Sequence, residues 1–60
     1  MDWLKELRLK KRLTQEETAK AAGMKRASYG NVETGVRTPS VKAAKRIAAV
    51  LGFEWQRFFE

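Results

Sequence analysis

The sequence predicts a small all-α fold of four to five helices, and three observations support this prediction. Apolar residues recur at spacings of three and four, and no segment alternates apolar and polar residues as a strand does. Gly23, Gly35, Pro39 and Gly52 divide the chain into short pieces. Helix-capping residues stand at the start of several of these pieces. Because the chain is short, we expect residues 1–60 to fold as a single domain.

The first helix is expected over residues 2–12. Leu4 and Leu7 fall on one stripe of this segment, and Trp3 lies close to it. Asp2 is expected to cap the helix, because a carboxylate can accept hydrogen bonds from the free main-chain N–H groups of the first turn. The apolar stripe would form one wall of the core.

The second helix is expected over residues 14–22. The segment TQEE places Glu17 three positions after Thr14. This is the spacing of a capping box, in which each side chain accepts a hydrogen bond from the other residue's main-chain N–H. Gly23 follows, and glycine readily adopts the positive φ that ends a helix. The segment therefore carries both a start signal and a stop signal.

Two further helices are expected before a short aromatic tail. One spans residues 25–34 and stops at Gly35. The other begins after Pro39, with Ser40 as its cap, and stops at Gly52. Its apolar positions at helical spacing are Val41, Ala44, Ala48 and Leu51. The tail that follows reads FEWQRFFE.

The composition argues against several classes of function. Lys and Arg number 13 against 7 Asp and Glu, which gives a formal net charge of +6, and Cys and His are absent. We therefore expect no metal site, no disulfide, no cofactor and no nucleophile–base pair, so the protein is not expected to be an enzyme. No apolar run approaches the roughly 20 residues of a membrane-spanning helix, and we expect a cytoplasmic protein. The positive charge favours a polyanion as partner.

The helices at 14–22 and 25–34 are joined by a turn of only about three residues, so they are expected to cross steeply, as in a helix-turn-helix. At 100° per residue, one arc of about 140° on the second helix holds mostly small or polar residues. They are Arg26, Ala27, Gly30, Asn31 and Thr34. Ser28, Tyr29 and Val32 fall on the opposite side and are expected in the core. Small side chains allow close approach to another surface, although a glycine inside a helix costs about 0.5 to 1 kcal/mol relative to Ala.

A set of residues in a fixed order carries a family resemblance. The set consists of Leu4, Leu7 and Arg8, LTQEETAKAAG at 13–23, VETG at 32–35, TPS at 38–40 and IAAVLGF at 47–53. In these positions the chain resembles the helix-turn-helix domain of lambda-repressor-like proteins, also called the XRE or Cro/CI type. The resemblance extends from Arg8 to Phe59. It implies a compact four- to five-helix domain that binds double-stranded DNA, with the helix at 25–34 in the major groove.

The resemblance also implies roles for individual residues. The positions that read bases correspond to Arg26, Ala27 and Asn31. The positions that contact the DNA backbone correspond to Gln15, Lys25, Arg37, Thr38 and Ser40. Arg8 and Glu33 match an ion pair that ties the first helix to the end of the third. An Arg guanidinium suits the two acceptors of guanine, and an Asn amide suits adenine.

Three residues depart from the family pattern. Thr18 and Tyr29 stand where the family generally has a Leu and an Ile or Leu. The smaller side chain could compensate for the larger one in volume, but the tyrosine hydroxyl would then need a partner or an exit to solvent. Gly30 replaces a small polar residue, which removes one potential contact and leaves room for close approach to DNA.

The leading functional prediction is a sequence-specific transcriptional regulator that acts at the nucleoid, as a repressor of the phage or mobile-element type. One recognition helix reads only about four base pairs, so a homodimer on a palindromic operator is expected. The candidates for the dimer interface are Phe53, Trp55, Phe58 and Phe59, in the segment where the family commonly places it. Alternatively, these rings close the core of the monomer. Because so small an interface would be weak, the dimer is expected to form fully only on DNA.

Other functions stay open. The main alternative is a DNA-binding antitoxin whose partner is a toxin protein, although the short segment after Gly52 is less than such proteins usually use to wrap a toxin. Less favoured are a non-specific nucleoid-type binder, a single-strand binder that stacks bases on aromatic rings, and a membrane-surface protein. Lys10, Lys11 and Arg12 are interpreted as a solvated helix end. No small-molecule effector is indicated, and the sequence does not distinguish a complete protein from a domain of a longer repressor.

Overall fold

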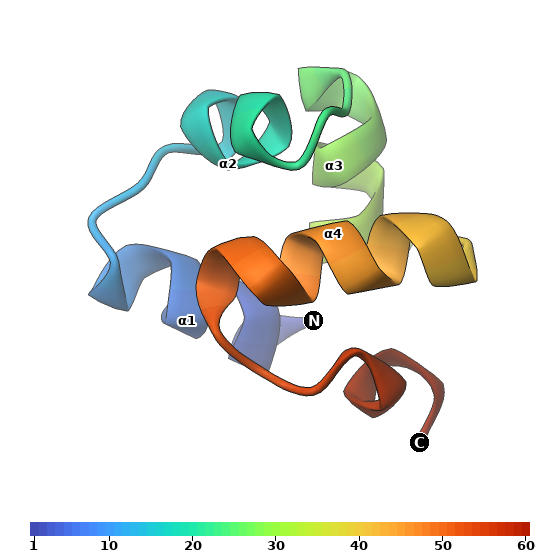
Figure 1. Ribbon diagram of the computed structural model, residues 1–60. Helices are drawn as coiled ribbons and strands as arrows, with labels where there is room; N and C mark the ends of the chain where they lie inside the picture. Colours follow the sequence, from blue (N-terminus) through green and yellow to red (C-terminus); the bar gives the residue numbers. More distant parts are fainter.

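Four α-helices and a terminal 3₁₀ helix pack together in the computed structural model, which describes residues 1–60 (Figure 1). The elements are α1 (Asp2–Lys10), α2 (Gln15–Ala21), α3 (Arg26–Glu33), α4 (Val41–Leu51) and the 3₁₀ helix η1 (Trp55–Phe59). The chain turns back after α4, so that η1 packs against that helix (Figure 1). The predicted all-α fold is confirmed. None of the helices is long and apolar enough to cross a membrane.

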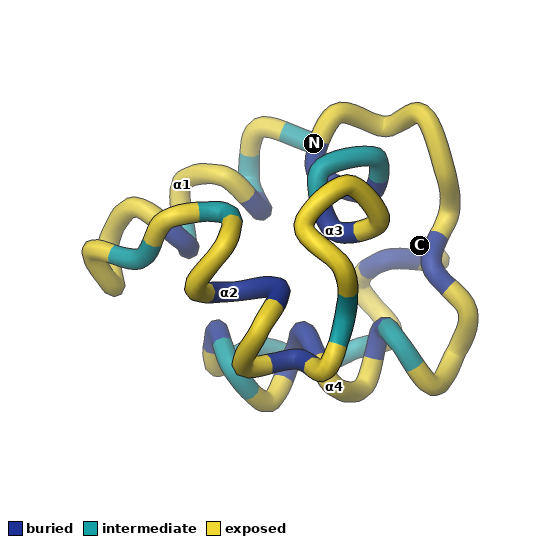
Figure 2. The backbone as a smooth tube through the Cα atoms, turned by 90° about the horizontal axis from the view of Figure 1, so that it is seen from above, coloured by how far each residue is buried: buried dark blue, intermediate teal, exposed yellow.

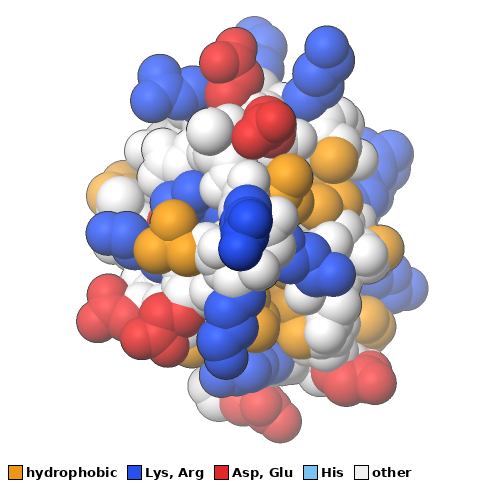
Figure 3. All heavy atoms as spheres, turned by 90° about the vertical axis from the view of Figure 1, so that its left-hand side faces the viewer, with side chains coloured by type: hydrophobic (Ala, Val, Ile, Leu, Met, Phe, Trp, Pro, Cys, Tyr) orange, Lys and Arg blue, Asp and Glu red, His pale blue; other side chains and the backbone are white.

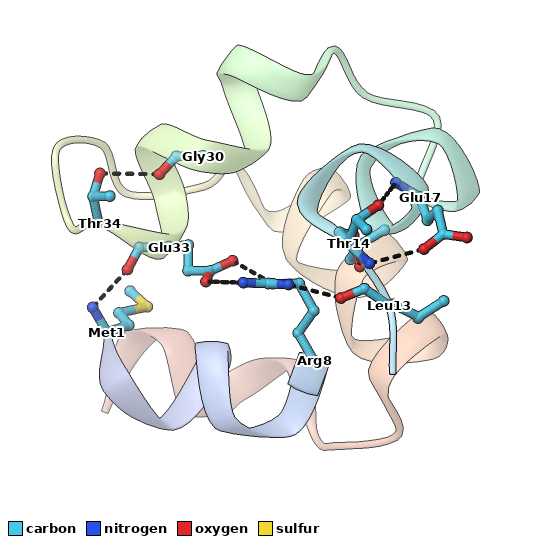
Figure 4. A network of polar contacts seen from close by, with 9 residues as sticks. Met1, Arg8, Leu13, Thr14, Glu17, Gly30, Glu33 and Thr34 are labelled. Carbon is cyan, nitrogen blue, oxygen red and sulfur yellow. Dashed lines mark hydrogen bonds and ion pairs between the residues drawn. The ribbon is translucent and has the colours of Figure 1, made fainter. Parts of the chain in front are cut away.

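The start of α1 differs from the prediction. Met1, not Asp2, is the N-cap residue, and no side chain caps the helix, so the predicted Asp2 cap is wrong. The α-amino group of Met1 donates a hydrogen bond to the main-chain oxygen of Glu33 at 2.7 Å (Figure 4). This contact draws Met1 against the end of α3, and Asp2 becomes the first residue of the helix.

The end of α1 also differs from the prediction, because the helix stops at Lys10 and not at residue 12. Arg12 has a φ of 57°, which is a left-handed backbone conformation that residues other than Gly and Asn rarely adopt. Its N–H donates to the oxygen of Leu9 at 2.9 Å, and the N–H of Leu13 donates to the oxygen of Arg8 at 3.3 Å. These two bonds form the closing pattern that glycine usually provides. The sequence contains no glycine here to signal the stop.

The predicted capping box of α2 is present. The main-chain N–H of Glu17 donates to the Thr14 hydroxyl at 3.0 Å, and the main-chain N–H of Thr14 donates to the Glu17 carboxylate at 2.9 Å. The hydrogen bond from the Thr14 main chain lowers the pKa of the Glu17 carboxyl. At the other end, Gly23 has a φ of 68°, and the N–H of Met24 donates to the oxygen of Ala19 at 2.8 Å. Both predicted ends of this helix are confirmed to within one or two residues.

The ends of α4 are also as predicted. The Ser40 hydroxyl accepts a hydrogen bond from the main-chain N–H of Ala43 at 3.1 Å, and Gly52 closes the helix with a φ of 77°. Val41, however, is 48% exposed, although it fits the apolar spacing of the helix. It lies in the first turn, at the edge of the buried stripe of α4, whereas Ile47 lies near the middle of that stripe and is 0% exposed.

The core is built from one face of each helix. Its buried apolar residues are Leu4, Ala19, Ala22, Tyr29, Val32, Ala44, Ile47, Leu51 and Phe58. Figure 2 shows that buried stretches alternate with exposed ones along the helices, while most of the connection between α3 and α4 is exposed. Ser28 is exposed, so its predicted core position is wrong. It lies at the edge of the inner face of α3, whose centre is occupied by Tyr29, Val32 and Glu33.

Thr18 and Tyr29, the two departures from the family pattern, are both 0% exposed. The Thr18 hydroxyl donates to the main-chain oxygen of Thr14 at 2.9 Å, one turn back on α2. The Tyr29 hydroxyl has neither of its expected outlets, because it is buried and makes no hydrogen bond. The larger ring and the smaller side chain thus pack into the core, but one polar atom is left without a partner.

Arg8 and Glu33 form an ion pair between α1 and α3, as the family resemblance implies (Figure 4). The Arg8 Nε donates to Glu33 Oε2 at 3.0 Å and to Oε1 at 3.3 Å, and Nη2 donates to Oε1 at 3.0 Å. Nη1 donates to the main-chain oxygen of Leu13 at 2.7 Å. Only 9% of the Arg8 side chain and 4% of the Glu33 side chain are exposed. One side chain therefore joins α1, α3 and the segment that leads into α2.

Removal of either partner of this pair should destabilise the fold. Glu33→Ala is expected to lower the free energy of unfolding by about 3 to 5 kcal/mol, because Arg8 would keep a buried charge without a partner. Arg8→Ala should lose a similar amount, and the double variant little more than either single one. Urea unfolding of the four proteins measures the coupling. If the losses in free energy of unfolding simply add, Arg8 and Glu33 do not interact, and the proposed contribution of the ion pair to the fold is wrong.

Candidate nucleic-acid interface

The outer face of α3 has the composition that the sequence predicts. Arg26, Ala27 and Thr34 are exposed, and Gly30 and Asn31 are half-buried. Apart from Arg26, these side chains are short or absent. The opposite face of the helix is buried against the rest of the protein. The helix therefore presents a low, polar surface that a second molecule can approach closely.

A hollow of about 460 Å³ runs along this face, between α3 and the start of α2. Its lining residues are Gln15, Arg26, Ala27, Gly30, Asn31 and Thr34. We call this the α3 hollow. It holds one predicted backbone-contacting residue, Gln15, together with every residue of the predicted arc.

A second hollow, of about 380 Å³, lies on the other side of the same residues, between α3 and the connection to α4. Its lining includes Ala27 and Asn31 from α3 and Arg37, Thr38 and Ser40 from the connection. Ala27 and Asn31 line both hollows and thus form a ridge between them. The structure brings the predicted base-reading ridge and the predicted backbone-contacting segments on either side of it onto one face of the protein.

Lys25 and Arg26 stand at the start of α3. Lys25 is the N-cap residue, although its side chain makes no capping hydrogen bond, and both side chains are exposed. The end of the helix is Glu33, with Thr34 as the C-cap residue. The Thr34 hydroxyl donates to the main-chain oxygen of Gly30 at 2.9 Å (Figure 4), which ties the side chain back onto the helix.

Gln15 is half-buried and lines three hollows on the protein surface. Besides the α3 hollow, it lines one with Thr14, Glu16 and Arg26, and another with Glu33, Thr34 and residues of α1. A Cβ atom added to Gly30 would lie 3.7 Å from Gln15 Oε1, an ordinary contact distance. The Gln15 amide therefore lies beside Gly30 and leaves room for a Cβ atom there.

Lys5 is a residue near this face that the sequence pattern did not single out. It is exposed and lines the hollow that also contains Gln15 and Thr34. It precedes Arg8 by three positions on α1 and so shares a side of that helix with it. In the sequence, only this three-residue spacing from Arg8 could have indicated that Lys5 lies near the α3 face.

The electrostatics behind α3 are governed by the ion pair. Burial is the largest influence and acts to raise the pKa of the Glu33 carboxyl, but Arg8, with smaller contributions from Tyr29 and Gln15, outweighs it in combination, so that the pKa is lowered. The same interaction with Glu33 raises the pKa of Arg8. The charges of the pair thus compensate each other, and the positive charge of Arg26 is left free on the outer face.

The C-terminal aromatic residues divide into two groups. Phe58 is buried, and its ring lies 5.4 Å from those of both Trp3 and Phe53. These three rings close the core beside α1. Phe59, by contrast, is 47% exposed, and Trp55, 6.1 Å from it, is half-buried. Of the four residues predicted at a dimer interface, Phe59 is thus the exposed one, Trp55 and Phe53 are both half-buried, and Phe58 is buried.

The end of the molecule that holds the connection between α1 and α2 carries several basic residues. Figure 3 shows Lys and Arg side chains spread over this face, interrupted by acidic and apolar groups. Lys10, Lys11 and Arg12 are all exposed. Their surroundings agree with the interpretation of this cluster as a solvated helix end.

Comparison with known proteins identifies the family. The helix-turn-helix family model HTH_3 matches residues 4–58. An uncharacterized HTH-type transcriptional regulator of Bacillus subtilis, YqaF, is 55% identical over 58 residues, which cover 97% of this chain and 76% of that protein. An uncharacterized HTH-type transcriptional regulator of Archaeoglobus fulgidus is 39% identical over 56 residues, or 93% of this chain and 79% of that protein.

A phage protein is also similar. The ImmF control region 10 kDa protein of Bacillus phage phi105 is 39% identical over 51 residues, which cover 85% of this chain and 57% of the phage protein. No solved structure matches the chain. Since the family model and the bacterial relative both extend over nearly all of it, the chain belongs to the lambda-repressor-like, or XRE-type, helix-turn-helix family of transcriptional regulators.

Proposed function

We propose that this protein represses transcription by occupying a DNA operator, with α3 in the major groove. The observation that carries the proposal is the ridge of Ala27 and Asn31 between two hollows, each of which is lined by residues suited to the DNA backbone. A helix with short side chains on its outer face can lie deep enough in the groove to reach base edges.

In this arrangement Arg26, Ala27 and Asn31 read bases. The Arg26 guanidinium donates to O6 and N7 of a guanine, the Asn31 amide pairs with an adenine, and Ala27 contacts a thymine methyl group. Gly30 allows the helix axis to approach the bases. The residues on either side contact phosphates and fix the position of α3: they are Gln15, Lys25, Arg37, Thr38 and Ser40.

The proposed role as a repressor of the phage type is supported by the similarity to a phage control-region protein. Operator occupancy by a helix-turn-helix domain is sufficient to block a promoter, so no further domain is needed for repression. A homodimer on a palindromic operator follows from the short site that a single helix reads. We place its interface at Phe59, the exposed ring of the aromatic segment, and its neighbour Trp55, since Phe58 and Phe53 pack against Trp3.

Selection of bound duplexes from a random DNA pool at physiological salt tests the proposal. A symmetrical consensus with two half-sites about 34 Å apart is expected. If the selected duplexes show no consensus and bind no better than scrambled ones, the protein is a non-specific nucleic-acid binder and the proposal is wrong. The selected duplex then serves as the operator in the measurements below.

Arg26→Ala should weaken binding to the selected operator by about 1 to 3 kcal/mol and relax the preference at one base pair, because a two-pronged contact to a base edge is lost. Binding to unrelated duplexes should change much less. Arg46→Ala is the matched control, since Arg46 is an exposed arginine on α4 that lies beside Gly23 and outside the α3 face. An equal loss on every duplex would make Arg26 a phosphate contact.

Two substitutions of Gly30 should separate helix stability from DNA binding. Gly30→Ala fits beside Gln15 and should stabilise the free protein by about 0.5 to 1 kcal/mol through helix propensity, with little effect on affinity. Gly30→Gln should also raise the melting temperature, but it fills the α3 hollow and should weaken operator binding at least tenfold. Unchanged affinity of Gly30→Gln would show that DNA does not approach this position closely.

The stoichiometry on DNA tests the dimer. Sedimentation of the protein with a palindromic operator should give two subunits per duplex, and the free protein should be largely monomeric because the interface is small. Phe59→Ala and Trp55→Ala should reduce the cooperativity of binding, while each subunit still binds a half-site. One subunit per duplex at saturating protein would contradict the dimer, and unaltered cooperativity in both variants would place the interface elsewhere.

A further inference from the structure

A hollow of about 320 Å³ lies beside the start of α1 and adjoins the face that we propose reads DNA. Its lining residues are Met1, Asp2, Lys5, Gln15, Glu33 and Thr34, and we call it the α1 hollow. Gln15 and Thr34 also line the α3 hollow, so the two hollows share a border. The phosphate contact proposed for Gln15 therefore places a DNA strand at the edge of the α1 hollow.

The ionisable groups of the α1 hollow leave one lysine free. The Glu33 carboxylate is compensated by Arg8, and the α-amino group of Met1 donates to the main-chain oxygen of Glu33 at 2.7 Å (Figure 4). Lys5 and Asp2 are both exposed, and neither forms an ion pair. Two positive groups thus stand against one uncompensated carboxylate, and the Lys5 ammonium keeps three N–H donors for a ligand.

The hollow on the other side of Gln15 suits a phosphate less well. Its lining residues are Arg8, Thr14, Gln15, Glu16 and Arg26. Glu16 is exposed and forms no ion pair, so its carboxylate repels a phosphate. Arg8 is held by Glu33, and Arg26 contacts a base in the proposed function. A strand that reaches Gln15 is therefore expected to continue toward Lys5.

The ion pair fixes the place of Lys5 relative to α3. Lys5 precedes Arg8 by three positions on α1, so the two residues share a side of that helix. Arg8 holds this side of α1 against the end of α3 through its bonds to Glu33. The main chain at Lys5 is thus held beside the DNA-facing side, while its long side chain stays free to extend toward a ligand.

We infer that Lys5 binds a phosphate on the strand that Gln15 contacts, so that the DNA footprint extends from α2 and α3 onto α1. A DNA strand carries one charged phosphate per nucleotide, so a further phosphate lies next to the one at Gln15. A lysine suits it, because an ammonium is a point charge that needs no fixed geometry. The inference rests on the proposed function, since Gln15 must contact the DNA backbone. Lys5 adds affinity but reads no base.

Lys5→Gln tests the contact, with Lys10→Gln as the matched control. Both remove an exposed lysine of α1, but Lys10 lies outside the hollows that border Gln15. Lys5→Gln should weaken binding to the selected operator and to an unrelated duplex by the same factor, about three- to tenfold. Lys10→Gln should change both affinities less than about twofold, because its charge is screened. Equal effects of the two variants would overturn the inference.

The salt dependence of binding gives a second readout. Each phosphate contact contributes about 0.9 to the slope of the logarithm of affinity against the logarithm of salt concentration. Lys5→Gln should reduce the slope by this amount, and Lys5→Arg, which keeps the charge, should preserve it. The melting temperature of Lys5→Gln should match that of the wild type, since Lys5 forms no ion pair in the free protein. An unchanged slope would overturn the inference.

Neutral methylphosphonate linkages in the selected operator locate the phosphate. The linkage that weakens binding of the wild type but not of Lys5→Gln marks the contact of Lys5, and the same comparison with Gln15→Ala marks that of Gln15. The two linkages should be neighbours on one strand. The inference is wrong if no linkage couples to Lys5, or if the coupled linkage lies on the other strand.

Failure of the inference differs from failure of the proposed function. If Arg26→Ala loses affinity chiefly on the operator while Lys5→Gln behaves like Lys10→Gln, the proposed function stands and the Lys5 contact is rejected. If the selection yields no consensus, the repressor proposal is wrong. The comparison of Lys5→Gln with Lys10→Gln on unrelated duplexes still decides whether Lys5 binds a phosphate.

Discussion

The buried ion pair between Arg8 and Glu33 is the contact on which the arrangement of the first three helices depends. These helices have nine, seven and eight residues, too few to be stable in isolation. The pair provides the only hydrogen bonds between two side chains in the protein, and its fourth bond, to Leu13, reaches the segment before α2. Such a pair contributes little net stability but is costly to break, so it penalises every arrangement that separates its partners.

The ion pair lies on the inner side of α3, opposite the face that we propose reads DNA. Glu33 is the last residue of α3, so its bond to Arg8 sets how that helix stands relative to α1. The outer face can then consist mostly of small residues that lie outside the core. Gly30 illustrates the division, because it weakens the helix yet keeps the surface of α3 beside Gln15 low. Stability thus resides on the inner face, and the recognition of DNA that we propose would use the outer one.

Local signals predicted most of the fold. The capping box of Thr14 and Glu17, the Ser40 cap and the stop at Gly52 each depend on residues within about four positions of one another, and all are present. The features that local signals missed have a different origin. Arg12 adopts a positive φ without being a glycine, and Val41 fits the apolar pattern of α4 but lies at its edge, where neighbouring elements do not cover it. Neither outcome is encoded in the nearby sequence.

The sequence by itself determined the helices, the positive charge and the arc of small residues on the third helix, because helical periodicity, caps and charge are properties of short segments. Only the tertiary structure decided which atoms meet across the chain. It brought Gln15 and Glu33 to one hollow, buried the Tyr29 hydroxyl without a partner, and put Phe58 in the core while leaving Phe59 exposed. The physical reason is that contacts between distant segments depend on how whole helices pack, and packing directs each side chain to a particular neighbour only after the helices have come together.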